Sequence, residues 1–184
     1  NMASSNVPHS VTLGTGNYLK KIPEMLQENP ADLLVIGAST TPNEAEVFVP
    51  ANVVKLAQAL HIPTLVVNQN TPSTEPNFKE ILFPMAPHKN FSIQTEEATK
   101  WANANNAKID VLCLISEGQN LPADIAANLE NCTAYFNDGK IDYTKTLKET
   151  KVYSVGYAKD IIHYAGEKHF DLITIMAQNS DENM

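Results

Sequence analysis

The cysteines and histidines are the first candidates for chemistry, but their spacing argues against it. Cys113 lies inside the apolar run IDVLCLI and Cys132 lies in a helical pattern, so we expect both to be buried core thiols. The five histidines are scattered, and the nearest pair, His163 and His169, is too far apart to place two ligands on one helix face. The sequence therefore predicts neither a metal site nor a disulfide framework.

Signatures of catalysis are also missing. The sequence has no Gly-x-Ser-x-Gly, no Gly-Lys-Ser/Thr phosphate loop and no His-Glu-x-x-His. No close pair of carboxylates falls in an apolar context that would tune a general acid. Asp32 and Asp171 each precede a buried apolar run, and we interpret them as turn or hinge residues. We expect no catalytic residue and no enzyme activity.

Composition and charge narrow the classes of partner. The chain has a formal net charge of -8, all 13 basic residues are Lys, and Arg is absent, so we expect no nucleic-acid binding. Hydrophobic residues make up 43%, which is typical of a globular chain, but no apolar run is long enough to insert into a membrane. Residues 1–11 show no secretion signal, and the unpaired thiols favour a cytoplasmic location.

Short apolar runs alternate with amphipathic helical patterns. The runs predict buried parallel strands at Leu33–Ile36, Thr64–Val67, Ile81–Met85, Ile109–Ile115 and Leu172–Ala177. The periodic segments predict helices at Pro50–His61, Ser92–Asn106, Asp124–Phe136 and Tyr157–Lys168, with Pro50 at a first helical position and Ser92 as an N-cap. This alternation predicts an α/β fold with a doubly wound parallel sheet.

Two further segments have a weaker pattern. A helix is indicated over Tyr18–Glu28, but Pro23 interrupts it, so the helix is expected to begin only near Ile22. Lys140–Val155 has β character without a clean period, which is compatible with one long strand or two short ones.

The chain contains an internal repeat. GNYLKKIPEMLQENPADLLVIGA, from Gly16, aligns with GYAKDIIHYAGEKHFDLITIMA, from Gly156, so that Asp32 corresponds to Asp171. A short β-like stretch precedes each copy, SVTLG and VYSVG. Between the copies lies NQNTPSTEPN, whose Pro, Thr and Asn content is typical of a linker.

Together these segments resemble the universal stress protein family. KEILFPM, EEATKWANANNAKIDVLCLIS and the second repeat are similar to one unit, and ADLLVIGA with VPANVVKLAQALHIPTLVV is similar to the second half of another. The resemblance covers nearly the whole chain from about Val11. It implies a Rossmann-like fold of the adenine nucleotide alpha hydrolase type, with five parallel strands in the order three-two-one-four-five.

The resemblance also implies a tandem of two partial units. Residues 1–68 would form the C-terminal half of a first unit with strands three to five, 69–77 a linker, and 78–184 a second unit lacking its last helix and strand. A sheet without its central strand one would expose two edges. We infer that the chain is a portion of a longer tandem protein, or that two partial copies combine within or between chains.

A degenerate nucleotide motif follows the first repeat. Ligands of doubly wound sheets bind beyond the carboxyl ends of the strands, at the switch point. ATP-binding relatives carry Gly-x-x-Gly, nine residues, then Gly-Ser or Gly-Thr. Gly37 matches the first position, but Thr40, Pro50 and Ala51 replace the other three. Pro50 has no amide hydrogen for a phosphate and Ala51 has no hydroxyl.

The second copy departs further from that motif. Met176 and Asn179 stand where Gly37 and Thr40 stand in the first copy. The resemblance places an Asp that meets the base after strand one, and here Met85 is followed by Ala86. Both halves of the pocket therefore lack polar anchors, so we expect no cofactor, with ATP or another adenine nucleotide as the alternative.

Three functions remain compatible with the sequence. The favoured one is a non-catalytic universal stress protein-like protein that acts in a stress response through homodimerisation and a protein partner. The second is the cytoplasmic regulatory domain of a membrane transporter of the cation/proton antiporter type. The third is a nucleotide-binding member of the family, and fold alone does not choose among them.

Overall fold

The computed structural model describes residues 7–38, 50–60, 62–68, 71, 78–86, 91–151 and 157–177, without the side chains of Pro50 and Ala51. The chain divides into two units, one formed by residues 1–71 with 177–184 and the other by residues 72–176. Most of the expected linker, and the stretch VYSVG, lie outside the described residues.

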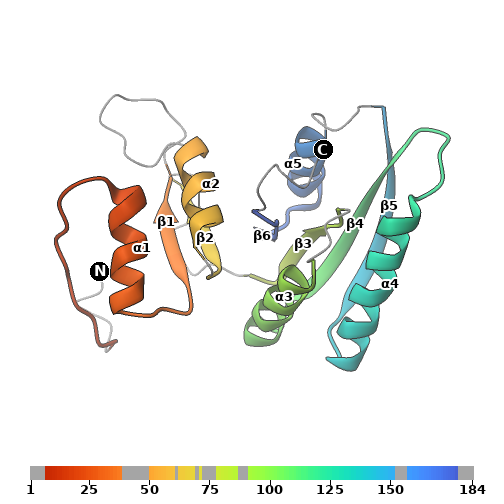
Figure 1. Ribbon diagram of the computed structural model, residues 1–184. Helices are drawn as coiled ribbons and strands as arrows, with labels where there is room; N and C mark the ends of the chain where they lie inside the picture. The colour runs from red at the N-terminus through yellow and green to blue at the C-terminus, as the bar shows by residue number, and fades with distance from the viewer. Residues whose placement is uncertain are drawn as a thin grey trace. The chain divides into compact units, whose positions relative to one another are not determined.

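The second unit contains a four-stranded parallel sheet. Its strands are β3 (Glu80–Pro84), β4 (Lys108–Ser116), β5 (Tyr143–Thr150) and β6 (Leu172–Ile173), in the spatial order β5-β4-β3-β6 (Figure 1). The expected parallel pairing is confirmed, and β3 is paired on both edges. In chain order this is three-two-one-four, the order that the resemblance implied. Lys140–Val155 was expected to contain one or two strands, and its described residues contain one, β5.

Helices cover both faces of this sheet, which makes it doubly wound. The helices α3 (Ser92–Asn105) and α4 (Ala123–Asp138) lie over one face, and α5 (Tyr157–Lys168) lies over the other (Figure 1). Residues in the left-handed region follow each helix and turn the chain back toward the sheet; they are Asn106 at φ 49°, Lys140 at φ 54° and His169 at φ 57°. The predicted α/β class is confirmed.

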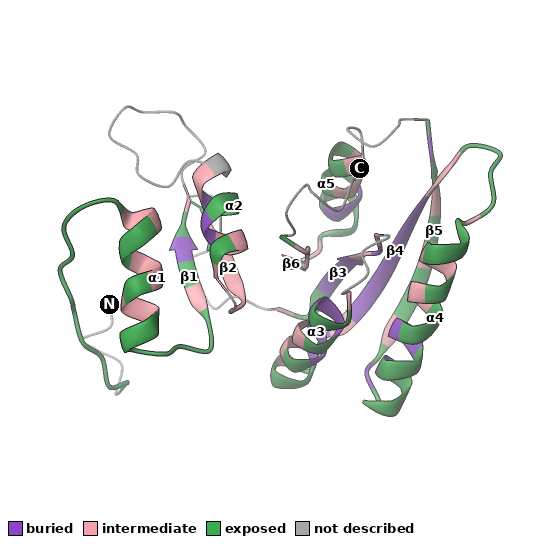
Figure 2. Cartoon of the chain, in the orientation of Figure 1, coloured by how far each residue is buried: buried purple, intermediate pink, exposed green. Residues whose placement is uncertain are grey.

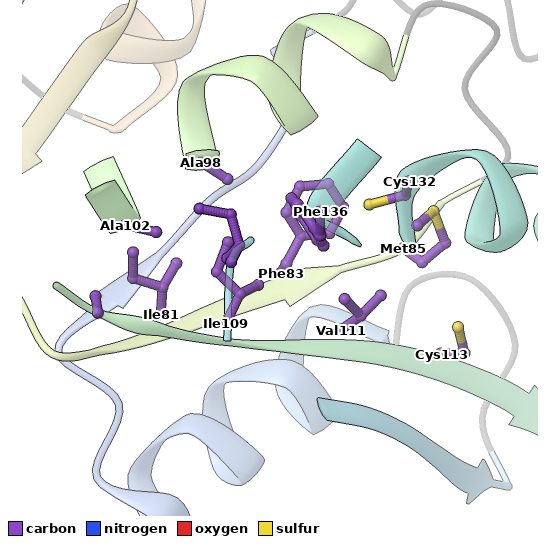
Figure 3. Packing of buried hydrophobic residues seen from close by; sticks show 12 residues of the cluster. Ile81, Phe83, Met85, Ala98, Ala102, Ile109, Val111, Cys113, Cys132 and Phe136 are labelled. Atoms are coloured by element: carbon purple, nitrogen blue, oxygen red, sulfur yellow. The ribbon is translucent and has the colours of Figure 1, made fainter. Parts of the chain in front are cut away.

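The main core lies between the sheet and the pair α3 and α4 (Figure 3). Alternate residues of β3, among them Ile81 and Phe83, point into it, and the rings of Phe83 and Phe136 meet edge to face with centroids 5.9 Å apart. Both phenyl rings are fully buried, and burying one such side chain contributes about 1.5–3 kcal/mol. Figure 2 shows β3 and β4 as the most continuously buried strands, and apart from Asp110 their buried residues are apolar.

The first unit is smaller. It contains α1 (Tyr18–Glu28), β1 (Leu34–Gly37), α2 (Pro50–Ala59) and β2 (Thr64–Val67), with β1 parallel to β2. The core of this unit gathers residues of α1 and α2 on one face of β1, centred on Ile36. A two-stranded sheet with helices on a single face has little buried surface of its own.

Several local expectations were wrong. The helix α1 runs through Pro23 from Tyr18, because Asn17 caps it by accepting a hydrogen bond from the Leu19 amide. Residue Phe91, not Ser92, is the N-cap of α3, and its side chain makes no capping hydrogen bond. The stretch SVTLG, residues 10–14, forms no strand, and β6 ends at Ile173 rather than at residue 177.

Candidate functional site

The switch point of the second unit lies between β3 and β6, because the chain runs from β3 through β4 to β5 and then returns to the other edge of β3. Gln94 on the first turn of α3 reaches this point. Its amide Nε2 donates to the Thr174 carbonyl oxygen at 2.9 Å and lies 3.3 Å from Thr174 Oγ1. Thr174 in turn donates its amide to the Leu82 carbonyl at 3.0 Å. A side-chain bridge therefore joins α3 to the segment after β6.

The residues after β3 are engaged within the protein. Met85, expected beside the base of a nucleotide, is 7% exposed and belongs to the main core (Figure 3). The Ala86 carbonyl accepts a hydrogen bond of 3.2 Å from Asn128 Nδ2 on α4. Neither residue offers a carboxylate to a ligand. Met176, three residues beyond β6, is half-buried, and Asn179 lies outside the described residues.

In the first unit the structure places two positions of the degenerate motif. Gly37 ends β1 in open space, with no atom near the site a Cβ would occupy, so no close backbone approach requires glycine there. The helix α2 begins at Pro50, as expected, and a proline at the first position removes one of the amides that would bind an anion. Thr40 lies outside the described residues, as do the side chains of Pro50 and Ala51.

A shallow hollow of about 330 Å³ lies at the opposite end of the sheet. Lysines and polar residues from the starts of β3 and β4 line it, including Lys79, Lys108 and Lys140. The Lys79 ammonium donates to the Asn105 carbonyl. This is the amino end of the strands, where ligands of doubly wound sheets do not bind, so the hollow is a poor candidate site.

A buried polar cluster lies between the sheet and α5. The Asp110 carboxylate on β4 is 9% exposed, and its Oδ2 accepts from Tyr164 Oη at 2.8 Å and from Thr146 Oγ1 at 3.1 Å. Among the described residues, Asp110 Oδ1 has no hydrogen-bond partner. Burial raises the pKa of the Tyr164 hydroxyl, and its contact with Asp110 raises it further. These contacts fasten α5 to two strands.

The two cysteines are free and buried, as expected. Burial raises the pKa of the Cys113 thiol to about 11 and that of Cys132 to about 11, so both are protonated and unreactive near neutral pH. Within the described part of the chain, no group of three His, Cys, Asp or Glu side chains could hold a metal ion. No helix among these residues is long and apolar enough to cross a membrane.

Asp171 has a structural position. Its Oδ2 accepts hydrogen bonds from the backbone amides of Lys79 at 2.9 Å and of Glu80 at 3.0 Å, and its own amide donates to the Glu80 carbonyl. The carboxylate thus holds the beginning of β3 against β6. Asp32, its counterpart in the repeat, is exposed, and no described residue forms a hydrogen bond with its side chain.

Sequence reasoning missed Gln94 and Asp110. Gln94 precedes Ala98 and Ala102 by four and eight residues, so helical spacing places it on the buried face of α3. Asp110 is a lone acid inside the run from Ile109 to Ile115, where a buried charge requires partners. Both signals were present in the sequence, but the hydrogen-bond partners come from distant segments.

Fold and site together define a doubly wound α/β protein whose switch point is bridged by side chains. No protein-family model and no curated protein matches the chain. The chain is similar to a solved structure, a protein from the universal stress protein family from Burkholderia pseudomallei. The two are 16% identical, with a TM-score of 0.41, and the alignment covers 55% of this chain and 82% of that chain.

Proposed function

We propose that this chain is a non-catalytic protein of universal stress protein type that acts through partner contacts and does not bind ATP tightly. The observation that carries this proposal is the Gln94 bridge. The Gln94 amide, 7% exposed, donates to Thr174 where the strand order reverses. A ligand at this point would have to displace that hydrogen bond, and an unpaired buried carbonyl costs about 1–3 kcal/mol.

The chemistry around the bridge supports the same proposal. Tight nucleotide binding requires charged or amide groups aimed at the phosphates and the base. The residues after β3 offer the apolar Met85 and a carbonyl that Asn128 already occupies. In the first unit Pro50 removes an amide from the start of α2. Three missing contacts of about 1–3 kcal/mol each weaken binding on the order of a thousandfold or more.

Homodimerisation is part of the proposal. Among the described residues, β2 pairs with β1 alone, so its other edge has unpaired backbone groups. Such an edge favours pairing with another chain. Val66 on β2 is also exposed, which adds apolar surface that pairing would cover. A stress-response role in the cytoplasm is the physiological part of this proposal, and free buried thiols are compatible with it.

Calorimetric titration of the full chain with ATP and magnesium tests the nucleotide part. We expect no binding below the millimolar range. The matched variant is Thr40→Gly with Pro50→Gly and Ala51→Ser, which restores the glycine motif of the first copy. It should also fail to bind, because among the described residues no strand stands beside β1 to form the base side of the pocket. Low-micromolar binding by the unmodified chain would refute the proposal.

A further inference from the structure

The helix α5 has a smaller apolar contact with the sheet than the pair α3 and α4 has. Its two buried side chains belong to a cluster separate from the main core, made of Leu82, Leu112, Leu114, Tyr164 and Ala165. Among the described residues, the main core on the other face gathers 12 buried residues, against 5 in this cluster. Because buried apolar area is the main favourable term in packing, α5 is held less strongly than α3 and α4.

Polar side chains provide much of the remaining contact of α5. Tyr164 Oη donates to Asp110 Oδ2 at 2.8 Å and lies 3.3 Å from Thr146 Oγ1. On β5, Lys148 Nζ lies 5.2 Å from the centre of the Tyr164 ring and 3.6 Å from Glu167 Oε2 of α5. Water can replace each partner in such contacts, so their loss costs less than their strength in isolation. The polar contacts therefore add little to the free energy needed to separate α5 from the sheet.

Asp110 adds a cost to the closed arrangement. Its carboxylate is 9% exposed, and Oδ1 has no hydrogen-bond partner among the described residues. Burial of a charged oxygen without a partner is unfavourable, and water would hydrate this oxygen once α5 moved away. Asp110 therefore acts in two directions. Its Oδ2 holds Tyr164, whereas its dehydrated Oδ1 favours separation of the helix.

The short strand β6 is tied to α5. His169, at φ 57°, ends the helix, and the Phe170 amide donates to the Ala165 carbonyl at 3.1 Å. The rings of Phe170 and Tyr164 lie with their centroids 5.7 Å apart. Among the described residues, β6 pairs with β3 over two residues, whereas β5 pairs with β4 over eight. A motion that lifts α5 from the sheet therefore moves β6 with it.

We propose that α5 and β6 separate from the sheet as one unit while β3, β4, β5, α3 and α4 stay folded, and that Asp110 sets the balance between the closed and open states. Separation breaks the hydrogen bond from Gln94 to Thr174 and exposes the edge of β3 that β6 occupies. The open state thus uncovers the switch point. The second unit is a two-state device in which one helix and one strand regulate access to that point.

Native-state hydrogen exchange of the full chain, measured at single amides by NMR in low concentrations of urea, tests the proposal. The α5 amides and that of Thr174, which donates to the Leu82 carbonyl, should show one opening equilibrium and one urea dependence. Relative to their intrinsic rates, they should exchange at least about a hundredfold faster than the β4 amides, which report global unfolding. Equal protection of α5 and β4, or separate openings of α5 and Thr174, would overturn the proposal.

Substitutions in the polar cluster test the role of Asp110. Tyr164→Phe removes a donor and should raise the open population about tenfold, whereas Tyr135→Phe, on an exposed ring of α4, should leave it unchanged. The apolar combination of Asp110→Leu, Thr146→Val and Tyr164→Phe should lower the open population at least about tenfold, because the buried charge is removed together with its donors. If this combination opens as often as the unmodified chain, Asp110 does not set the balance.

Thiol labelling provides a second measurement, which does not depend on hydrogen exchange. Ala165→Cys places a thiol on the buried face of α5, and the matched control Ala102→Cys places one on the buried face of α3. Under native conditions, N-ethylmaleimide should modify position 165 at least about tenfold faster than position 102. Cys113 and Cys132, in the main core, should stay unmodified over the same time, and mass spectrometry of the digested chain reports each site. Equal rates at the two positions would overturn the proposal. None of these readouts depends on nucleotide binding.

Discussion

The Asp171 carboxylate lies 2.9 Å from the Lys79 backbone nitrogen and accepts its hydrogen. Because Asp171 precedes β6 and Lys79 precedes β3, a single side chain sets the register of the shortest pairing in the sheet. Among the described residues, two residue pairs join β6 to β3. The aspartate therefore compensates for the few backbone hydrogen bonds at this edge of the sheet.

Replacing Asp171 with alanine should lower the free energy of unfolding by about 1.5–3 kcal/mol, because two amides lose a charged acceptor. Urea denaturation followed by circular dichroism measures it. Asp32→Ala is the matched control, since it changes the equivalent residue of the repeat, and should change stability by less than about 0.5 kcal/mol. Equal losses in the two variants would contradict the assignment of the cap to Asp171.

The Gln94 bridge makes a second prediction. Gln94→Leu keeps most of the buried volume but leaves the Thr174 carbonyl without its side-chain donor, so the free energy of unfolding should fall by about 1–3 kcal/mol. Asn103→Leu, at an exposed position of the same helix, should be nearly neutral. Denaturant midpoints measure both. If Gln94→Leu were also neutral, the bridge would contribute nothing to closing the switch point.

Most of the fold could be predicted because the apolar runs of β3 and β4 are buried on both faces and have no competing periodicity. The run from Leu172 to Ala177 misled, since it is apolar enough for a longer strand but pairs over only two residues. Pro23 led to the opposite error, because the helix was expected to begin only near Ile22. The Asn17 cap and packing against the first unit's core extend α1 back to Tyr18.

The candidate site could be predicted only in part. The absence of polar anchors at Pro50 and Ala86 is visible in the letters alone, because residue type decides whether an amide hydrogen or a carboxylate exists. The side chains that occupy the switch point could not be predicted from the sequence. The contact between Gln94 and Thr174 joins residues that are 80 positions apart, and its geometry depends on how α3 and β6 lie on β3.

The polar cluster under α5 makes a third prediction. Tyr164→Phe removes one of the two donors to Asp110 Oδ2 and leaves a buried carboxylate with fewer partners. The free energy of unfolding should fall by about 1.5–3 kcal/mol, the range for a hydrogen bond to a charged group. Tyr135→Phe, on an exposed ring of α4, is the control and should cost less than about 0.5 kcal/mol.

A double-mutant cycle completes this test. Thr146→Val removes the other donor to the same oxygen. Because both hydroxyls serve one acceptor, the combined loss of Tyr164→Phe and Thr146→Val should differ from the sum of the single losses by more than about 0.5 kcal/mol. Simple additivity would show that the two contacts do not act as one cluster.

Because two thiols are buried, we expect the free energy of unfolding to fall at alkaline pH. Burial raises the pKa of Cys113 and of Cys132 from 9.0 to about 11, so the folded state retains these protons longer than the unfolded chain. Their contribution is fully present below pH 9 and is lost as pH rises toward about 11. Tyr164 acts in the same direction at higher pH, because its pKa is raised from 10.0.

Urea midpoints measured from pH 8 upward should therefore decline through this window. The upper bound is roughly 2.7 kcal/mol for each thiol, from about 1.36 kcal/mol per pKa unit. Cys132→Val removes one titrating group and should flatten the decline. The variant's stability at pH 8 will differ from that of the unmodified chain, in either direction, because the substitution also changes core packing. An unchanged pH slope in that variant would show that Cys132 does not titrate in this range.

The central claim is that the chain is a partner-binding protein without a bound nucleotide, and native mass spectrometry of the freshly purified chain tests it most directly. One spectrum reports both the oligomeric state and any ligand that remains bound. The account predicts a homodimer with a mass of twice 20.2 kDa and no added mass. A species carrying the mass of an adenine nucleotide, or a monomer at micromolar concentration, would contradict it.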